Sequence, residues 1–280
     1  DNSVDETAAE VLSSEYNLDF ASCVGALIYL ALSRIDIIHA VNKMAKFTRR
    51  PGRNHFMALI HVLRYLRDNS YLGISFYSDV ERSPIHLMLG NSETPELSKE
   101  LFFTFSDSSW NDDVDTGRST GCYLISYMGG IVDHSSNLPD PVALSSAEAE
   151  YNEACLACMA TTHMRMLLDE LEGNKKPFWK VPLILDSKSA IAMGSSFRDT
   201  KHTRHILRRY HYVREGVAAN RFQTFWIKTD EELADIGTKQ TSGPRHTLLT
   251  NRLLVQVSDG AKSIKAAFAK LVQYKRGVRV

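Results

Sequence analysis

The 280-residue sequence has few cysteines, no excess of either charge and no long hydrophobic run. Its four cysteines are too few and too unevenly spaced for a disulfide scaffold in a chain of this length. Cys155 and Cys158 form a C-x-x-C pair, but this pair lies in an apolar helical run and no second pair exists. Packing is therefore a better interpretation of the pair than zinc or redox chemistry. We expect a reducing compartment.

The sequence also lacks the patterns of a membrane span and of a secretion signal. No apolar stretch approaches the roughly 20 residues that cross a bilayer. Residues 1–15 are acidic and lack the apolar core of a signal peptide. We therefore expect a soluble protein that is not secreted and has no membrane partner.

Basic residues are concentrated in two segments although the chain as a whole is neutral, with 33 Lys and Arg against 33 Asp and Glu. Residues 37–67 contain seven basic residues and no acidic one, and residues 197–228 contain eight against Asp199 and Glu215. Such segments are either solvated helix faces or surfaces that hold a phosphate backbone. Composition alone leaves both interpretations open.

Hydrophobic periodicity predicts two structural units. Apolar residues recur at helical spacing through residues 16–72, and residues 77–99 are rich in turn signals, which favours a loop or short hairpin. The remaining pattern predicts strands at 101–106, 119–127, 130–135, 181–185 and 222–227, with helices at 145–171, 187–193 and 203–219 and from about 230. This order predicts an α/β fold, a mixed five-stranded sheet flanked by helices. The expected organisation is a leader (1–15), a helical unit (16–76), a linker (77–100), the sheet domain (101–242) and a C-terminal tail (243–280).

Carboxylates are the candidate functional groups of the sheet domain. Asp107 and Asp186 each follow a predicted strand, and ligands of open α/β sheets bind beyond strand ends. Glu148 and Glu150 begin the long helix about 200° apart, so only one can face a shared site, and helix geometry does not choose. Asp235 is the fourth candidate. Each has a structural alternative, because Asp suits turns and Glu148 fits a capping box with Ser145.

Several short segments, in this order and spacing, resemble the RNase H domain of copia-type retrotransposon polyproteins. They are RSTG from 118, ALSSAEAEY from 143, DSKSAIA from 186, KH from 201 with YH from 210 and RE from 214, and LADIGTK from 233. Upstream, VGALIYL from 24, SRIDI from 33 and LRYL from 63 resemble the end of the reverse transcriptase of the same elements. The resemblance covers about residues 16–254. Each segment is weak alone, but the ordered set is specific.

The resemblance implies an RNase H-like fold with a catalytic Asp-Glu-Asp-Asp set that falls on Asp107, Glu148, Asp186 and Asp235. The family's glutamate aligns with Glu148 and leaves Glu150 as a surface or supporting residue. The set would hold two Mg²⁺ ions, with Mn²⁺ as a possible substitute, because hydrolysis of a phosphodiester needs an activated water and a stabilised leaving oxygen.

The resemblance also implies the substrate and the partners. The activity would be endonucleolytic cleavage of the RNA strand of RNA/DNA hybrids during reverse transcription, and the partners would be the hybrid and the remainder of the polyprotein. The location would be intracellular, in a cytoplasmic virus-like particle or in the nucleus. The expected nucleic-acid contacts are Ser187, Lys188, Lys201, His202, Arg204, Arg208, Arg209 and Arg214.

Some positions depart from the family pattern. Ile35, Ala147 and Gly237 replace more usual residues, and no histidine lies on the loop before Asp235. Gly237 is expected to weaken the last helix by up to about 1 kcal/mol. Two other functions remain open: a non-catalytic hybrid-binding tether or domesticated structural remnant, and a DNA-strand transferase of the integrase type. An integrase-type transferase needs only three acids, so the fourth, Asp235, counts against that function.

Overall fold

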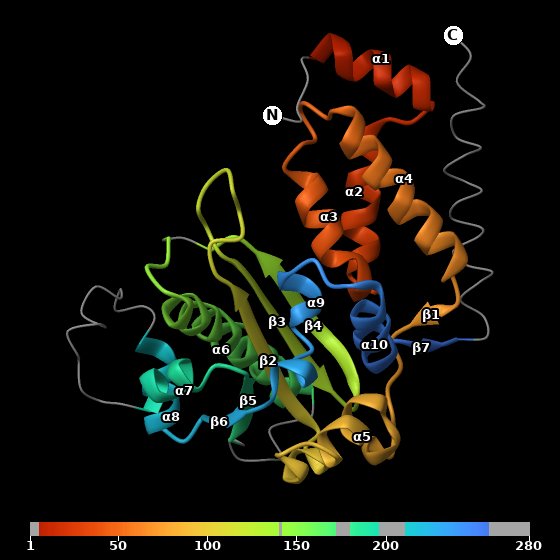
Figure 1. Cartoon of the computed structure of the whole chain (residues 1–280). Helices are drawn as coiled ribbons and strands as arrows, with labels where there is room; N and C mark the ends of the chain where they lie inside the picture. The colour runs from red at the N-terminus through yellow and green to blue at the C-terminus, as the bar shows by residue number, and fades with distance from the viewer. Residues whose placement is uncertain (1–5, 140–141, 172–179, 196–210, 258–280) are drawn as a thin grey trace. The chain divides into compact units, whose positions relative to one another are not determined.

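The computed structural model describes residues 6–139, 142–171, 180–195 and 211–257 (Figure 1). The chain divides into two compact units. Residues 1–75 and 254–280 belong to the first unit, and residues 76–253 belong to the second. Within the described ranges, no helix is long and apolar enough to cross a membrane.

The first unit is helical, as the periodicity predicts. Its elements are α1 (Glu6–Tyr16), α2 (Phe20–Ala31), η1 (Ile35–Ile37), α3 (Ile38–Ala45) and α4 (Arg53–Asp68), and a short antiparallel pair joins β1 (Leu72–Gly73) to β7 (Val255–Gln256). Phe20, Val24, Phe56 and Leu59 lie in its core. Asp19 caps α2 by accepting a hydrogen bond from the Ser22 backbone N–H. The unit is therefore stabilised mainly by packing of amphipathic helix faces.

A buried ion pair within the SRIDI segment is hydrogen-bonded to the LRYL segment. Arg34 donates from Nε and Nη2 to the two carboxylate oxygens of Asp36, at 2.9 and 2.6 Å. Tyr65 donates its hydroxyl to Asp36 at 2.7 Å, and Arg34 Nη1 donates to the Asn69 carbonyl at 3.0 Å. Both side chains of the pair are almost fully buried. These motif residues thus have a structural role in the helical unit.

We expect Asp36→Asn to lower the free energy of unfolding by about 3–5 kcal/mol, because it leaves the Arg34 guanidinium buried without a counter-charge. Asp68→Asn is the matched control. Asp68 pairs with Arg67 on the surface, where water screens the interaction, so its loss should leave the free energy of unfolding almost unchanged. Urea unfolding of the two variants measures the difference. Equal effects would contradict a structural role for the buried pair.

The second unit contains the mixed five-stranded sheet that the sequence predicts, with strand order β4-β3-β2-β5-β6. The strands are β2 (Phe102–Ser109), β3 (Thr120–Tyr127), β4 (Gly130–Asn137), β5 (Val181–Leu185) and β6 (Phe222–Trp226). β2, β3 and β4 pair antiparallel, whereas β5 is parallel to both β2 and β6. Met128 and Gly129 turn the chain between β3 and β4 with φ of 52° and 77°, as a tight hairpin requires.

Helices cover both faces of this sheet (Figure 1). A Cβ atom at Gly121 would meet the Glu153 carboxylate of α6 (Ser146–Leu171), whereas one at Gly237 of α9 (Asp235–Thr238) would meet Cys122. Neighbouring strand residues point to opposite faces, so α6 and α9 lie on opposite sides. Cys155 and Cys158 of α6 pack in the core, as expected. The other helices are α7 (Lys188–Ser195), α8 (Tyr212–Ala218) and α10 (Gly243–Leu253).

The segment 77–99 is helical, and the expected loop or hairpin is wrong. It contains η2 (Val80–Arg82), α5 (Pro84–Gly90) and η3 (Pro95–Lys99). Ser83 caps α5 by accepting from the His86 N–H, and Pro84 occupies the first turn, where its missing N–H costs nothing. The Ser-Pro and Thr-Pro pairs begin helices here rather than turns.

The chain after β6 also differs from the expected continuous helix. A short 3-10 turn, η5 (Thr229–Glu231), precedes α9, and α10 follows within the residues expected as a tail. Residues 243–253 belong to the sheet unit, so only later residues of the expected tail belong to the other unit. The rest of that tail, residues 258–280, lies outside the described residues.

Gly237 is required by close packing, contrary to the expected weakening of a helix. An added Cβ would lie 2.4 Å from Cys122 Sγ and 3.0 Å from its Cβ. The Gly237 carbonyl also accepts a hydrogen bond from Ser136 Oγ at 2.7 Å. The missing side chain therefore lets α9 approach β3 and β4.

We expect Gly237→Ala to lower the free energy of unfolding by about 1–3 kcal/mol, because the added methyl overpacks the contact with Cys122. Gly243→Ala is the control, since no heavy atom lies within 4 Å of an added Cβ there. That change should be neutral or slightly stabilising. Urea unfolding compares the two, and a Gly237→Ala variant at least as stable as Gly243→Ala would contradict the packing role.

Candidate metal centre

Three carboxylates from separate segments meet at one end of the sheet. Asp107, Glu150 and Asp186 each offer an oxygen, and these oxygens lie within 4.8 Å of one another. Thr104 pairs with Leu183 and Phe105 with Ile184 across the parallel strands. The same register brings Asp107 level with Asp186, on strands about 4.8 Å apart. Glu150 is delivered by the N-terminal part of α6.

Glu150, not Glu148, is the glutamate of this cluster, so the cluster differs from the set that the resemblance implies. Glu148 Oε2 accepts a hydrogen bond from the Leu144 N–H at 2.8 Å, and the Glu148 N–H donates to Ser145 Oγ at 3.2 Å. Glu148 is thus used in capping α6. Because the two glutamates point about 200° apart on the helix, the one beside the cap cannot also face Asp107.

Asp186 is fixed by contacts from β6 and the loop after it. Thr229 Oγ1 donates to Asp186 Oδ2 at 2.8 Å, and Trp226 Nε1 donates to the Asp186 carbonyl at 2.9 Å. These bonds hold both the backbone and the carboxylate of Asp186. Because β6 lies beside β5, the strand order places these two donors next to Asp186.

Asp235, the fourth predicted acid, lies beside Asp107 but outside the group of three. The Lys239 ammonium lies 2.6 Å from Asp235 Oδ1 and 3.6 Å from Asp107 Oδ2, so it joins the two carboxylates. Thr238 donates its hydroxyl to Asp107 Oδ2. Arg245 of α10 donates from Nη2 to Asp235 Oδ2 at 3.1 Å. Sequence reasoning assigned no role to Thr238, Lys239 or Arg245.

Burial and mutual repulsion raise the pKa values of Asp107 and Glu150. Burial raises the pKa of Asp107 to about 7, and Asp235 and Asp186 add to the rise while Lys239 opposes it. Burial, followed by repulsion from Asp107 and Asp186, raises the pKa of Glu150 to about 10. Asp107 Oδ1 and Glu150 Oε2 are buried and have no hydrogen-bond partner among the described residues. Once these carboxylates lose their protons, their hard oxygen atoms are the kind of ligand that Mg²⁺ and Mn²⁺ prefer.

Two further buried acids were not predicted. Glu153 lies against Gly121 with no exposed surface, and burial followed by the charge of Asp107 raises its pKa to about 8. Glu232 is equally buried, and burial raises its pKa as well. The spacing of Glu153 three residues after Glu150, on one face of α6, is the signal that could have found it. When these acids lose their protons, they add buried negative charge near Asp107, which a cation would stabilise.

The predicted nucleic-acid contacts are described only in part. Ser187 Oγ accepts from the Ala190 N–H at the start of α7, and the Lys188 ammonium lies 4.1 Å from the centre of the Trp226 ring. Arg214 is only 9% exposed, so it has little surface to offer to a phosphate. The other predicted contacts lie outside the described residues: Lys201, His202, Arg204, Arg208 and Arg209.

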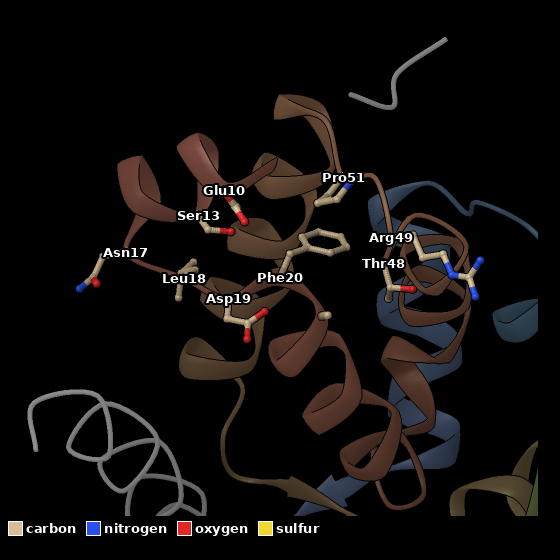
Figure 2. Close-up of a pocket in the computed structure, with 10 residues that line it drawn as sticks. Glu10, Ser13, Asn17, Leu18, Asp19, Phe20, Thr48, Arg49 and Pro51 are labelled. Atoms are coloured by element: carbon tan, nitrogen blue, oxygen red, sulfur yellow. The ribbon is translucent and has the colours of Figure 1, made fainter. Parts of the chain in front are cut away.

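A cavity of about 520 Å³ in the helical unit is a weaker candidate site (Figure 2). Glu10, Asp19, Thr48 and Arg49 supply polar groups to its lining. The Asp19 carboxylate, however, is used by Ser22, whose backbone N–H and hydroxyl both donate to it. The cavity brings together no set of carboxylates comparable to that of the sheet unit.

Comparison with known proteins gives relatives of one kind over most of the chain. The chain is 30% identical over 234 residues to the "Retrovirus-related Pol polyprotein from transposon TNT 1-94" of Nicotiana tabacum, covering 83% of this chain and 16% of that protein. It is 30% identical over 226 residues to the corresponding polyprotein from transposon RE1 of Arabidopsis thaliana, covering 80% of this chain and 14% of that protein. The chain therefore spans about a sixth of these relatives. No protein-family model matches it.

Two other similarities cover about half of the chain. "Secreted RxLR effector protein 161" of Plasmopara viticola is 35% identical over 136 residues, which cover 48% of this chain and 83% of that protein. Among solved structures, the N-terminal RNase H domain of a Mycobacterium tuberculosis protein matches 49% of this chain and 89% of that chain, with a TM-score of 0.37 and 13% identity. At that TM-score, the assignment of the fold rests on the topology of the sheet itself.

The sheet unit has the RNase H-like fold that was expected, a five-stranded mixed sheet with helices on both faces. The similarity to transposon polyproteins covers 83% of the chain, so it extends beyond the sheet unit. Over most of its length, the chain is homologous to the Pol polyproteins of copia-type retrotransposons.

We expect divalent-metal binding to release protons and to strengthen as pH rises. Asp107 and Glu150 must lose their protons to bind a cation, and their raised pKa values place this loss near and above neutral pH. Between pH 6 and pH 8 the affinity should rise by up to about tenfold per pH unit for each proton released. Calorimetric titration with Mg²⁺ in buffers of different ionisation enthalpy counts the protons. A pH-independent affinity without proton release would show that these acids are not the ligands.

Proposed function

We propose that the sheet unit hydrolyses the RNA strand of RNA/DNA hybrids in a reaction that depends on Mg²⁺. The observation that carries the proposal is the convergence of Asp107, Glu150 and Asp186 within 4.8 Å, on an RNase H-like sheet. Asp235, linked to Asp107 through Lys239, would complete the acidic set. The similarity to transposon Pol polyproteins supports the same activity.

The side chains of this site would hold and orient the reacting groups. Bound Mg²⁺ would supply activation of the attacking water and stabilisation of the leaving oxygen. Asp107 lies on the central strand between the other acids, so it is the residue best placed to be shared by two ions. The Thr238 hydroxyl fixes one oxygen of Asp107, and Thr229 fixes one oxygen of Asp186. These bonds preorganise the carboxylates, which lowers the cost of ordering them on binding.

Binding of the hybrid would use its phosphates and the 2′-hydroxyls of its wide minor groove, without reading base sequence. Lys188 is the described basic residue nearest to the site in sequence, two positions after Asp186. The predicted contacts between residues 201 and 209 lie outside the described residues. The remainder of the polyprotein is the proposed partner that delivers the hybrid. Binding would weaken with added salt as phosphate counterions compete.

We expect Glu150→Gln to lower the rate of cleavage of a labelled RNA/DNA hybrid in Mg²⁺ by at least about a hundredfold, because it removes a metal ligand. Glu148→Gln is the matched control. Gln keeps an oxygen that can accept from the Leu144 N–H, so this variant should retain the wild-type rate within a few-fold. Cleavage by gel assay separates the two glutamates of α6.

Asp107→Asn extends the test to the central strand and should remove detectable cleavage. A wild-type chain that cuts no better than Asp107→Asn but still binds hybrid with a steep salt dependence would overturn the proposal and favour the non-catalytic tether. Loss of cleavage in Glu148→Gln with retention in Glu150→Gln would restore the assignment of Glu148 made from the resemblance.

A further inference from the structure

The two sides of Asp107 differ in how much positive charge the protein itself supplies. On one side lie Glu150 and Asp186, where no described residue forms a hydrogen bond to the buried oxygens Asp107 Oδ1 and Glu150 Oε2. On the other side lies Asp235, whose two oxygens contact Lys239 and Arg245 at 2.6 and 3.1 Å. Among the described residues, positively charged side chains therefore contact the Asp235 side of the acidic set before any metal binds.

The Lys239 ammonium is the cation that lies between two of the predicted ligands. It is 2.6 Å from Asp235 and 3.6 Å from Asp107, which are contact distances for an ion pair. Arg245 contacts only Asp235 of this pair, and its guanidinium also donates to the carbonyls of Thr229 and Glu232 at 2.7 and 3.4 Å. Arg245 is therefore anchored to the backbone, whereas Lys239 is held mainly by the two carboxylates.

Lys239 is also able to leave. Its side chain is 39% exposed, although both of its carboxylate partners are buried. A lysine ammonium is a compact charge on a flexible stem of four carbons and has no fixed geometry to satisfy. Its exposed part gives the ammonium a route into solvent.

We propose that Lys239 is a positioning residue that occupies the place of a second divalent cation between Asp107 and Asp235, so that the two metal positions have unequal affinity. The inference rests on the proposed function and deepens it. The first ion binds among Asp107, Glu150 and Asp186 without competition. The second ion binds only after the Lys239 ammonium has moved away. Lys239 thus keeps Asp107 and Asp235 together in the metal-free chain and sets the metal concentration at which the site fills.

Binding of Mn²⁺ to the full chain, without nucleic acid, tests the proposal. Electron paramagnetic resonance counts free and bound Mn²⁺ in a titration. The wild type should bind one ion at least about tenfold more tightly than a second, and Lys239→Met should tighten the second step by about tenfold, because it removes the competing charge and keeps the length of the side chain. Lys239→Arg, which retains the charge, should keep the second step weak.

Lys228→Met is the matched control. Lys228 pairs with Glu93 on the surface, so its loss should leave both binding steps unchanged. Thermal unfolding in EDTA adds a readout that is independent of metal. Lys239→Met should melt at lower temperature than the wild type, and Mn²⁺ should restore more stability to it than to the wild type. Lys239→Gln replaces Lys239→Met should the latter not fold.

Two equal Mn²⁺ sites in the wild type, no Mn²⁺ binding, or a second step in Lys239→Met that is unchanged or weaker would each overturn the proposal. These outcomes can be distinguished from failure of the proposed function. If the wild type cuts no hybrid but Lys239→Met still tightens the second step, the catalytic proposal fails and the role of Lys239 stands. If cleavage depends on Glu150 but the second binding step is unchanged in Lys239→Met, the catalytic proposal stands and the role of Lys239 fails.

Discussion

Buried carboxylates that repel one another are the constraint on which the sheet unit depends. Asp107, Glu150, Glu153 and Glu232 are each nearly or fully buried, and burial raises the pKa of every one of them. Without a cation, the chain tolerates this arrangement by keeping protons on the acids and by placing Lys239 against Asp107. Such a site reduces stability in the metal-free state and gains it when a cation binds.

Backbone geometry, rather than side-chain flexibility, brings the carboxylates together. The parallel register of β2 and β5 places Asp107 level with Asp186, and the cap of α6 fixes which glutamate turns toward them. α9 can approach the opposite face because Gly237 has no side chain to meet Cys122. Asp235, Thr238 and Lys239 follow from that close approach. Each of these carboxylates is therefore held by an element whose position is set by hydrogen bonding or packing.

Much of this arrangement could be predicted from the sequence, because its signals are local. The apolar runs predicted the strands, and Asp107 and Asp186 were found because each follows a predicted strand, although β2 continues through Asp107 to Ser109. The resemblance pointed to Glu148, whereas the structure places Glu150 in the cluster and uses Glu148 at the start of α6, as the capping-box pattern of Ser145 and Glu148 allowed. The segment 77–99 was misread because Ser-Pro pairs occur both in turns and at helix starts.

Long-range contacts could not be predicted in the same way. Thr238 donates to Asp107 across 131 positions of the chain, and Arg245 comes from a helix in a region that was expected to be a tail. The demand for glycine at position 237 depends on Cys122, a residue of another strand. Nothing in the local pattern specifies such pairs, because they arise only when the sheet and α9 have packed.

The location of a bound ion tests the central claim most directly. Anomalous X-ray diffraction from crystals of the chain grown with Mn²⁺ would locate the metal without reference to any activity. We expect a strong peak about 2.1 Å from carboxylate oxygens of Asp107, Glu150 and Asp186. A peak bound by Glu148, or no peak near Asp107 in crystals that hold Mn²⁺ elsewhere, would contradict the assignment of this site.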